Sequence, residues 1–253
     1  MREIQGEVEK VVSNPDKSEI IRESHKKRLA LLQAIQQADI NTMEKINSEI
    51  FDIVEKDTID IMKRIEGNTL RSYKNFMLSH NSMYALVAEI GGLDPVLAHY
   101  MSEKYAIIIE SSPSIKDLVE LHNQLLEDYC SPKNRITLDD KKSLSAKVLY
   151  YVTANFMNPL DVQHIAKEFF VTREHLMRTF KKETGTTINE TIKEKRLLES
   201  KLLLKQSKLS ITDIAIMVGF NSSQYFSKVF KETYGISPTQ YQKSEDEIEK
   251  VET

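Results

Sequence analysis

The sequence predicts an all-α protein, and three observations lead to that prediction. Apolar residues recur at helical spacing in nearly every segment, and no stretch alternates apolar and polar residues as a strand does. Only 7 Gly and 6 Pro interrupt the 253 residues, so the helices have few breaks. Hydrophobic residues make up 40% of the chain, which is enough to build a core.

The N-terminal half is predicted to form a bundle of five helices. Asn41 or Thr42 is expected to cap the second helix, and the Gly pair at 91–92 to end the third. Asp94 caps the fourth, with Pro95 in the first helical position. The five cover residues 17–37, 41–64, 70–90, a stretch from 95 onward, and 114–130.

A change in charge and composition predicts the domain organisation. Residues 131–135, which contain Pro132, read as a linker, so we expect a helical domain over 1–135 and a second domain over 136–243. Residues 144–243 hold 15 Lys and Arg against 9 Asp and Glu, although the whole chain has a net charge of -3. The tail 244–253 is acidic, with too few apolar residues to pack, and is predicted to be disordered. A basic domain beside acidic segments is typical of a protein in which one domain meets phosphate.

Within the basic domain one outline occurs twice. Residues 175–185 and 225–235 each pair an apolar residue with a Phe four positions on, followed by a basic run and a Gly. A short helical pattern with an Ile-Ala step precedes each, at 165–166 and 214–215. Two such units in one domain predict two DNA-binding helix-turn-helix elements.

The spacing also predicts which faces of the repeated helices are buried. Leu176 and Phe180 share one face of the first helix, and Phe226 and Phe230 share one face of the second. The opposite stripe of each helix would enter a major groove, where Arg178 could pair with guanine. Those stripes are Glu174, Met177, Arg178 and Lys181, and Gln224, Ser227, Lys228 and Lys231.

The C-terminal hundred residues resemble the DNA-binding domain of the AraC/XylS family of bacterial transcription regulators. Residues 180–185, 211–222, 224–231 and 234–241 carry the resemblance. It implies about seven helices, with two helix-turn-helix units joined by a long helix over about 188–205. A helix of that length spans about 25 Å, which suits successive major-groove segments on one face of DNA. Phe170 departs from the family's pattern, because a residue able to take a positive φ angle is usual there, as Gly219 is in the second unit.

The resemblance places the DNA contacts on both units. Base contacts are expected from Glu174, Met177, Arg178, Ser223, Gln224, Ser227 and Lys228. Phosphate contacts are expected from Arg173, His175, Lys181, Lys182 and Lys231.

The N-terminal half indicates less about function. Residues 70–75 and 88–95 resemble a helical segment found ahead of this domain in some regulators of Gram-positive bacteria. Three roles remain open for this half: ligand binding, homodimerisation through residues 1–135, and contact with a partner protein. RNA polymerase is a candidate partner. The sequence identifies no small-molecule effector. Tyr73, Phe76, Met77, Met83 and Tyr84 are read as core, with an apolar pocket as the alternative. His80, His99 and His122 lack a paired ligand spacing, so we expect no metal and no cofactor.

These observations predict a sequence-specific DNA-binding transcription regulator that is not an enzyme. A fused DNA-repair alkyltransferase would need a nucleophilic Cys in a Pro-Cys-His-Arg context, which the lone Cys130 lacks. An architectural or antagonist protein without sequence preference remains the alternative. Without an apolar run of 18 residues or a secretory start, the chain is expected in the cytoplasm and not in a membrane.

Overall fold

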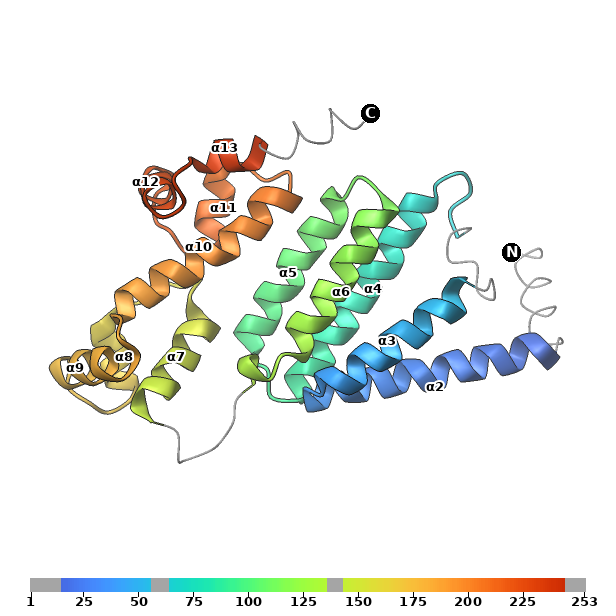
Figure 1. Ribbon diagram of the computed structural model, residues 1–253, viewed down its shortest axis with the longest axis horizontal. Coiled ribbons are helices and arrows are strands. Elements are labelled where there is room, and N and C mark those ends of the chain that lie inside the picture. The colour runs from blue at the N-terminus through green and yellow to red at the C-terminus, as the bar shows by residue number, and fades with distance from the viewer. Residues whose placement is uncertain (1–14, 56–63, 136–142, 244–253) are drawn as a thin grey trace. The chain divides into compact units, whose positions relative to one another are not determined.

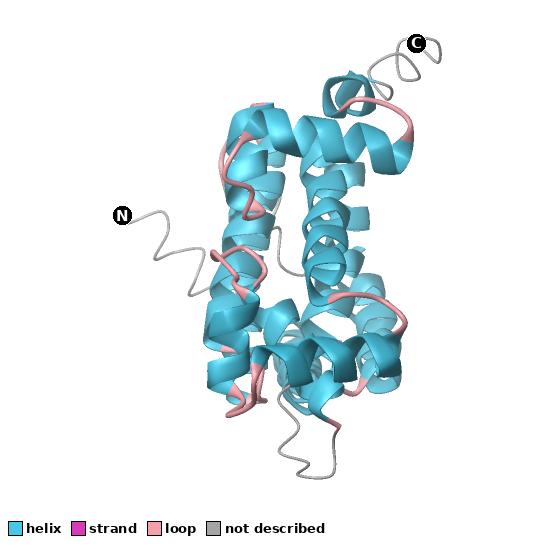
Figure 2. Ribbon diagram, turned by 90° about the vertical axis from the view of Figure 1, so that its left-hand side faces the viewer, coloured by secondary structure: helices cyan, strands magenta, loops and turns pink. Residues whose placement is uncertain are grey.

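The computed structural model describes residues 15–55, 64–135 and 143–243, and it confirms the all-α prediction for these ranges. Their regular elements are twelve α-helices and one 3₁₀ turn, with no strand (Figures 1 and 2). None of the described helices is long and apolar enough to cross a bilayer. The chain forms two compact units: unit 1 comprises residues 1–93 and 113–135, and unit 2 comprises residues 94–112 and 136–253.

Unit 1 is a bundle in which the helices predicted for this region are present. In the described ranges, α2 packs against α3, α4 and α6, and α4 packs against α6. Ser114 caps α6 by accepting from the backbone N–H of Asp117. The bounds are α2 (Pro15–Gln37), α3 (Ile40–Glu55), α4 (Thr69–Ile90) and α6 (Ile115–Cys130).

The start of α3 differs from the sequence prediction. Asp39, and neither Asn41 nor Thr42, caps this helix: its carboxylate accepts from the backbone N–H of Thr42 at 3.1 Å and from the Thr42 hydroxyl at 2.6 Å. These bonds hold the pKa of Asp39 below its usual value. The helix predicted to continue to residue 64 is described only as far as Glu55, and the acidic tail at 244–253 also lies outside the described residues.

The segment predicted as a linker is instead packed into unit 1. Residues Pro132–Asn134 form the 3₁₀ turn η2, and the next residue, Arg135, is buried. Its guanidinium donates to the carbonyl oxygen of Ile35 at 2.8 Å and to that of Tyr129, and its backbone pairs with Leu93. A buried guanidinium needs such acceptors, which the backbone of α2 and α6 supplies.

Aromatic and histidine side chains of α4 and α6 lie within the core of unit 1. Tyr73, Met77 and Tyr84 are buried, as the core interpretation expects, and the Tyr84 hydroxyl lies 3.3 Å from Nε2 of His122. Burial lowers the pKa of His122 to about 4, so this ring is neutral in the folded protein at pH 7. Cys130 is also buried, and burial raises the pKa of its thiol to about 11.

The described residues of unit 2 contain the seven C-terminal helices that the family resemblance implies, and one more. Its bounds are α5 (Pro95–Ser111), α7 (Leu144–Asn155), α8 (Val162–Glu168), α9 (Arg173–Thr184), α10 (Ile188–Gln206), α11 (Ile211–Met217), α12 (Ser223–Tyr234) and α13 (Pro238–Lys243). The additional helix is α5, which begins as predicted with Asp94 as its cap and Pro95 in the first turn. Unit 2 therefore includes a segment that lies before residue 135 in the sequence.

Candidate nucleic-acid interface

Two helix-turn-helix units are built on the ends of α10. The α8–α9 pair lies at one end of this helix and the α11–α12 pair at the other (Figure 1). In the first pair Leu176 and Phe180 of α9 pack on Ile165 of α8 in a buried cluster. In the second pair Phe226 and Phe230 are fully buried. The faces predicted to be buried from their spacing are therefore the buried ones.

The two turns share a left-handed residue at the same place and the same backbone hydrogen bond, although their sequences differ. Phe170 has a φ angle of 55° and Gly219 has one of 92°. The residue after each of them donates its backbone N–H to the carbonyl of the Ile-Ala step: Val171 to Ala166 at 3.0 Å, and Phe220 to Ala215 at 2.8 Å. The departure at Phe170 thus leaves the turn intact, with the aromatic ring 96% exposed.

We expect Phe170→Gly to raise the free energy of unfolding by up to about 1 kcal/mol, because a left-handed φ angle strains any residue with a Cβ atom. The exposed ring contributes little burial that could offset this strain. Urea denaturation of the two proteins measures the difference. A clear loss of stability in the glycine variant would show that the Phe170 ring makes a stabilising contact.

Hydroxyl side chains fix the start of both exposed helices. Thr172 caps α9 by accepting from the backbone N–H of His175, and Ser222 caps α12 by accepting from that of Tyr225, both at 3.2 Å. The N-terminal turns of the two helices, which would lead into a groove, are therefore well defined.

The exposed face of α9 carries the residues predicted from the sequence. Met177 is 40% exposed, and the charged members of the stripe are open to solvent. This helix carries four permanently positive side chains, two Arg and two Lys, and only two carboxylates, those of Glu174 and Glu183. The exposed residues of the predicted interface here are Arg173, Glu174, His175, Met177, Arg178, Lys181 and Lys182.

The corresponding face of α12 is more polar and less charged. Gln224 is exposed, whereas Ser223 and Ser227 are half-buried. The Ser222 hydroxyl donates to Oε1 of Gln224 at 2.8 Å, so the residue that caps the helix also orients this amide. Lys228 and Lys231 are exposed, and Nζ of Lys228 lies 3.9 Å from Glu232.

Tyr225 is an exposed residue of this face that the sequence interpretation missed. Its ring is 55% exposed and meets Phe220 edge-on, with 6.1 Å between the ring centroids. It follows Gln224 in the first turn of α12, so its position next to a predicted base contact could have indicated from the sequence that Tyr225 belongs to this face.

Comparison with known proteins identifies this region. Residues 165–244 match a family described as a helix-turn-helix domain. The transcriptional activator AarP of Providencia stuartii is 34% identical over 105 residues, a match covering 42% of this chain and 78% of AarP. The chain belongs to the AraC/XylS family of transcription regulators. Its C-terminal part is therefore an AraC-type DNA-binding domain, and the predicted fold and family are confirmed.

A longer protein and a solved domain are also similar to this AraC-type chain. It is 28% identical over 257 residues to histidine kinase P4 of Formosa agariphila; the match covers 93% of the chain but only 19% of the kinase. The chain thus spans about a fifth of the length of that relative. The solved C-terminal domain of AraT, a response regulator from Geobacillus stearothermophilus, is 27% identical with a TM-score of 0.40, covering 42% of the chain and 88% of that domain.

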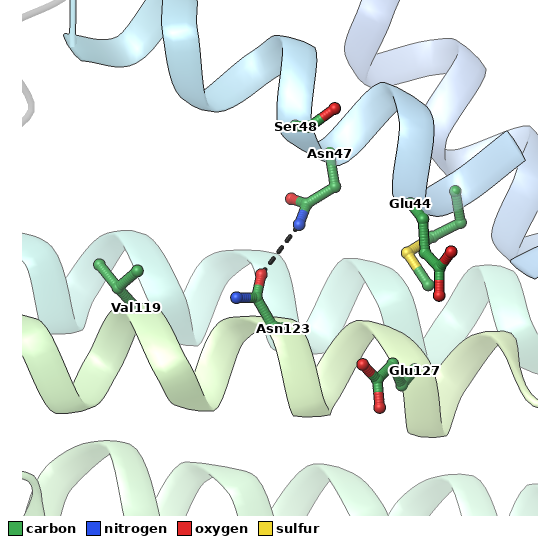
Figure 3. A pocket seen from close by; sticks show the side chains of 7 residues that line it. Glu44, Asn47, Ser48, Val119, Asn123 and Glu127 are labelled. Atoms are coloured by element: carbon green, nitrogen blue, oxygen red, sulfur yellow. Dashed lines mark hydrogen bonds between the residues drawn. The ribbon is translucent and has the colours of Figure 1, made fainter. Parts of the chain in front are cut away.

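Unit 1 carries a separate pocket between α3 and α6. It has a volume of about 370 Å³, and Nδ2 of Asn47 donates to Oδ1 of Asn123 across it at 2.9 Å (Figure 3). Glu44 and Glu127 both line it, so its chemistry suits a polar or cationic small molecule. The described residues contain no group of three His, Cys, Asp or Glu side chains that could hold a metal ion.

Proposed function

We propose that this AraC-type chain is a sequence-specific transcription regulator that inserts α9 and α12 into successive major-groove segments of DNA. The observation that carries the proposal is that two helix-turn-helix units with equivalent turn hydrogen bonds present different side chains on their exposed faces. Equal scaffolds would dock in the same way, whereas different side chains would recognise different base pairs. We therefore expect a non-palindromic site for each monomer.

The proposed base contacts lie toward the N-terminal ends of both exposed helices. Arg178 is suited to donate two hydrogen bonds to a guanine, and Gln224 to pair with an adenine. The Ser222 hydroxyl occupies one lone pair of Oε1 of Gln224, which leaves the second lone pair and the amide N–H groups available to an adenine. The proposed base contacts are Glu174, Met177, Arg178, Ser223, Gln224, Ser227 and Lys228.

The proposed phosphate contacts surround these positions and carry most of the positive charge. Side chains of this kind hold the protein in register on the duplex without reading its sequence. They are Arg173, His175, Lys181, Lys182 and Lys231, four of them on α9. We expect the first unit to supply the larger share of the salt-dependent attraction.

Arg178→Ala is expected to weaken binding to the preferred site by about 1–3 kcal/mol and to relax the preference at one base pair. Selection of bound DNA from a random pool, by the full chain and by this variant, measures both effects. If the variant selected an unchanged site, the assignment of Arg178 as a base contact would be wrong.

Lys181→Ala on the same helix is the matched comparison, because it removes one positive charge from a proposed phosphate contact. It is expected to weaken binding to all sequences alike and to lower the slope of log affinity against log salt by about 1. A change in base preference in this variant would contradict its assignment to phosphate.

Architectural binding without sequence preference is the alternative, which the similarity to transcription regulators does not favour. Competition between the selected site and random duplex separates the two: a specificity ratio near one would support the alternative. In the regulator proposal the chain performs no catalysis and works in the cytoplasm. Unit 1 would then serve dimerisation, effector binding or contact with RNA polymerase.

A further inference from the structure

The helix α5 lies outside the segment that matches the helix-turn-helix family, yet it packs within the DNA-binding unit. It lies against α7 and α10. The ring of Tyr100 meets the ring of Phe156 edge-on, with 4.9 Å between the centroids. At the end of the helix, the Ser111 hydroxyl accepts from the backbone N–H of Lys208 at 3.3 Å. These contacts join α5 to the end of α7 and to the segment that follows α10.

A buried ion pair connects α5 to the middle of α10. The Lys104 side chain is 4% exposed, and its Nζ lies 3.2 Å from Oε2 of Glu199, whose side chain is 14% exposed. Lys195, one turn earlier on α10, contacts Oε1 of Glu199 at 2.6 Å. The Lys104 ammonium also lies 4.7 Å from the centroid of the Tyr105 ring.

The charges within this cluster depend on one another. Burial alone would raise the pKa of Glu199, but the two lysines outweigh it and lower that pKa to about 2. Removal of one lysine ammonium would leave the buried Glu199 carboxylate with one positively charged partner instead of two, which would destabilise the folded protein. The charges of this cluster therefore favour one arrangement of α5 on α10.

The position of Glu199 on α10 gives this contact a consequence for DNA binding. Because α10 alone connects the two helix-turn-helix units along the chain, the placement of α7 and α9 against α10 affects the separation of α9 and α12, and α5 packs on both α7 and α10. The chain also passes between the two units on both sides of α5, after Leu93 and after Ser112. Changes in unit 1 can therefore reach α5 through both of its ends.

We propose that α5 is a working part of the DNA-binding unit, and that Lys104 is a positioning residue that holds α10 so that α9 and α12 keep a fixed spacing. The proposal rests on the proposed function, since it concerns how a bipartite site is read. It makes α5 the element through which unit 1 would adjust DNA binding.

The test uses the full chain and the bipartite site obtained by selection. Affinity is measured for that site and for versions with one base pair inserted or removed between its halves. The wild-type protein is expected to discriminate strongly against altered spacing. Lys104→Met keeps the length of the side chain but removes its charge, and it is expected to reduce this discrimination by about tenfold or more. Glu103→Gln, which changes an exposed neighbour on α5, should leave discrimination unchanged.

Spacing discrimination separates positioning from a general loss of stability, because partial unfolding lowers the affinity for all duplexes by the same factor. Should Lys104→Met fail to fold, Glu199→Gln gives the same comparison from the other side of the pair. Unchanged discrimination in a folded variant would overturn the role of Lys104. Failure of the wild-type protein to prefer any sequence would instead overturn the proposed function, and the inference with it.

Discussion

Replacement of Phe230 by Ala is expected to lower the free energy of unfolding of unit 2 by about 3–5 kcal/mol. Phe230 is fully buried in the second helix-turn-helix unit. Its ring centroid lies 5.6 Å from that of Phe226, 4.7 Å from that of Tyr234 and 5.5 Å from that of Tyr241. Truncation would remove these contacts and leave a cavity between α12 and α13, which the surrounding rings can fill only in part.

Urea denaturation of the full chain, followed by circular dichroism, measures this loss. Phe170→Ala is the matched control, because it removes the same group from a position where the ring is 96% exposed; we expect a change within about 0.5 kcal/mol there. DNA binding by the Phe230 variant should fall together with its stability. Similar losses from both substitutions would contradict the burial on which the prediction depends.

The burial of Phe230 belongs to the part of the fold that the sequence predicts well. Helical spacing placed Phe226 and Phe230 on one inward face, and the exposed stripe opposite follows from the same periodicity. The local capping signal was equally informative at Asp94, because a cap acts within one turn. At the start of α3, three residues that can cap a helix lie within four positions, and the sequence does not distinguish them. In the structure Asp39 is the cap, and Asn41 and Thr42 are not.

Long-range contacts could not be predicted in this way. Lys104 reads in the sequence as an ordinary solvated lysine, and its partner Glu199 is 95 residues away. Arg135 likewise sits in a Pro-containing segment typical of a linker, although its guanidinium is buried against carbonyls of α2 and α6. At the candidate interface, the bond from Ser222 to Gln224 depends on side-chain rotamers, which no spacing pattern specifies.

Gly219→Ala is expected to lower the free energy of unfolding by about 2–4 kcal/mol, for two reasons. The φ angle of 92° strains any residue with a Cβ atom. An added Cβ would also lie 2.6 Å from the carbonyl oxygen of Phe156 and 2.9 Å from Nε of Arg196. That Nε donates to the same carbonyl at 2.7 Å, and Nη2 of Arg196 donates to the carbonyl of Asn158 at 2.8 Å. The methyl group would therefore disturb the junction between α10 and the end of α7.

Gly185→Ala separates these two causes. Gly185 has a φ angle of 78°, but an added Cβ there meets no atom within 4 Å, so only the backbone strain of about 1–2 kcal/mol should apply. The difference between the two variants in urea denaturation measures the contribution of crowding at the Arg196 junction. Equal losses of stability in the two variants would mean that the residues around Arg196 accommodate the added methyl group without a cost in free energy. A larger loss at Gly219 would explain why Phe170 is tolerated at the equivalent turn, where the side chain points into solvent and only the strain remains.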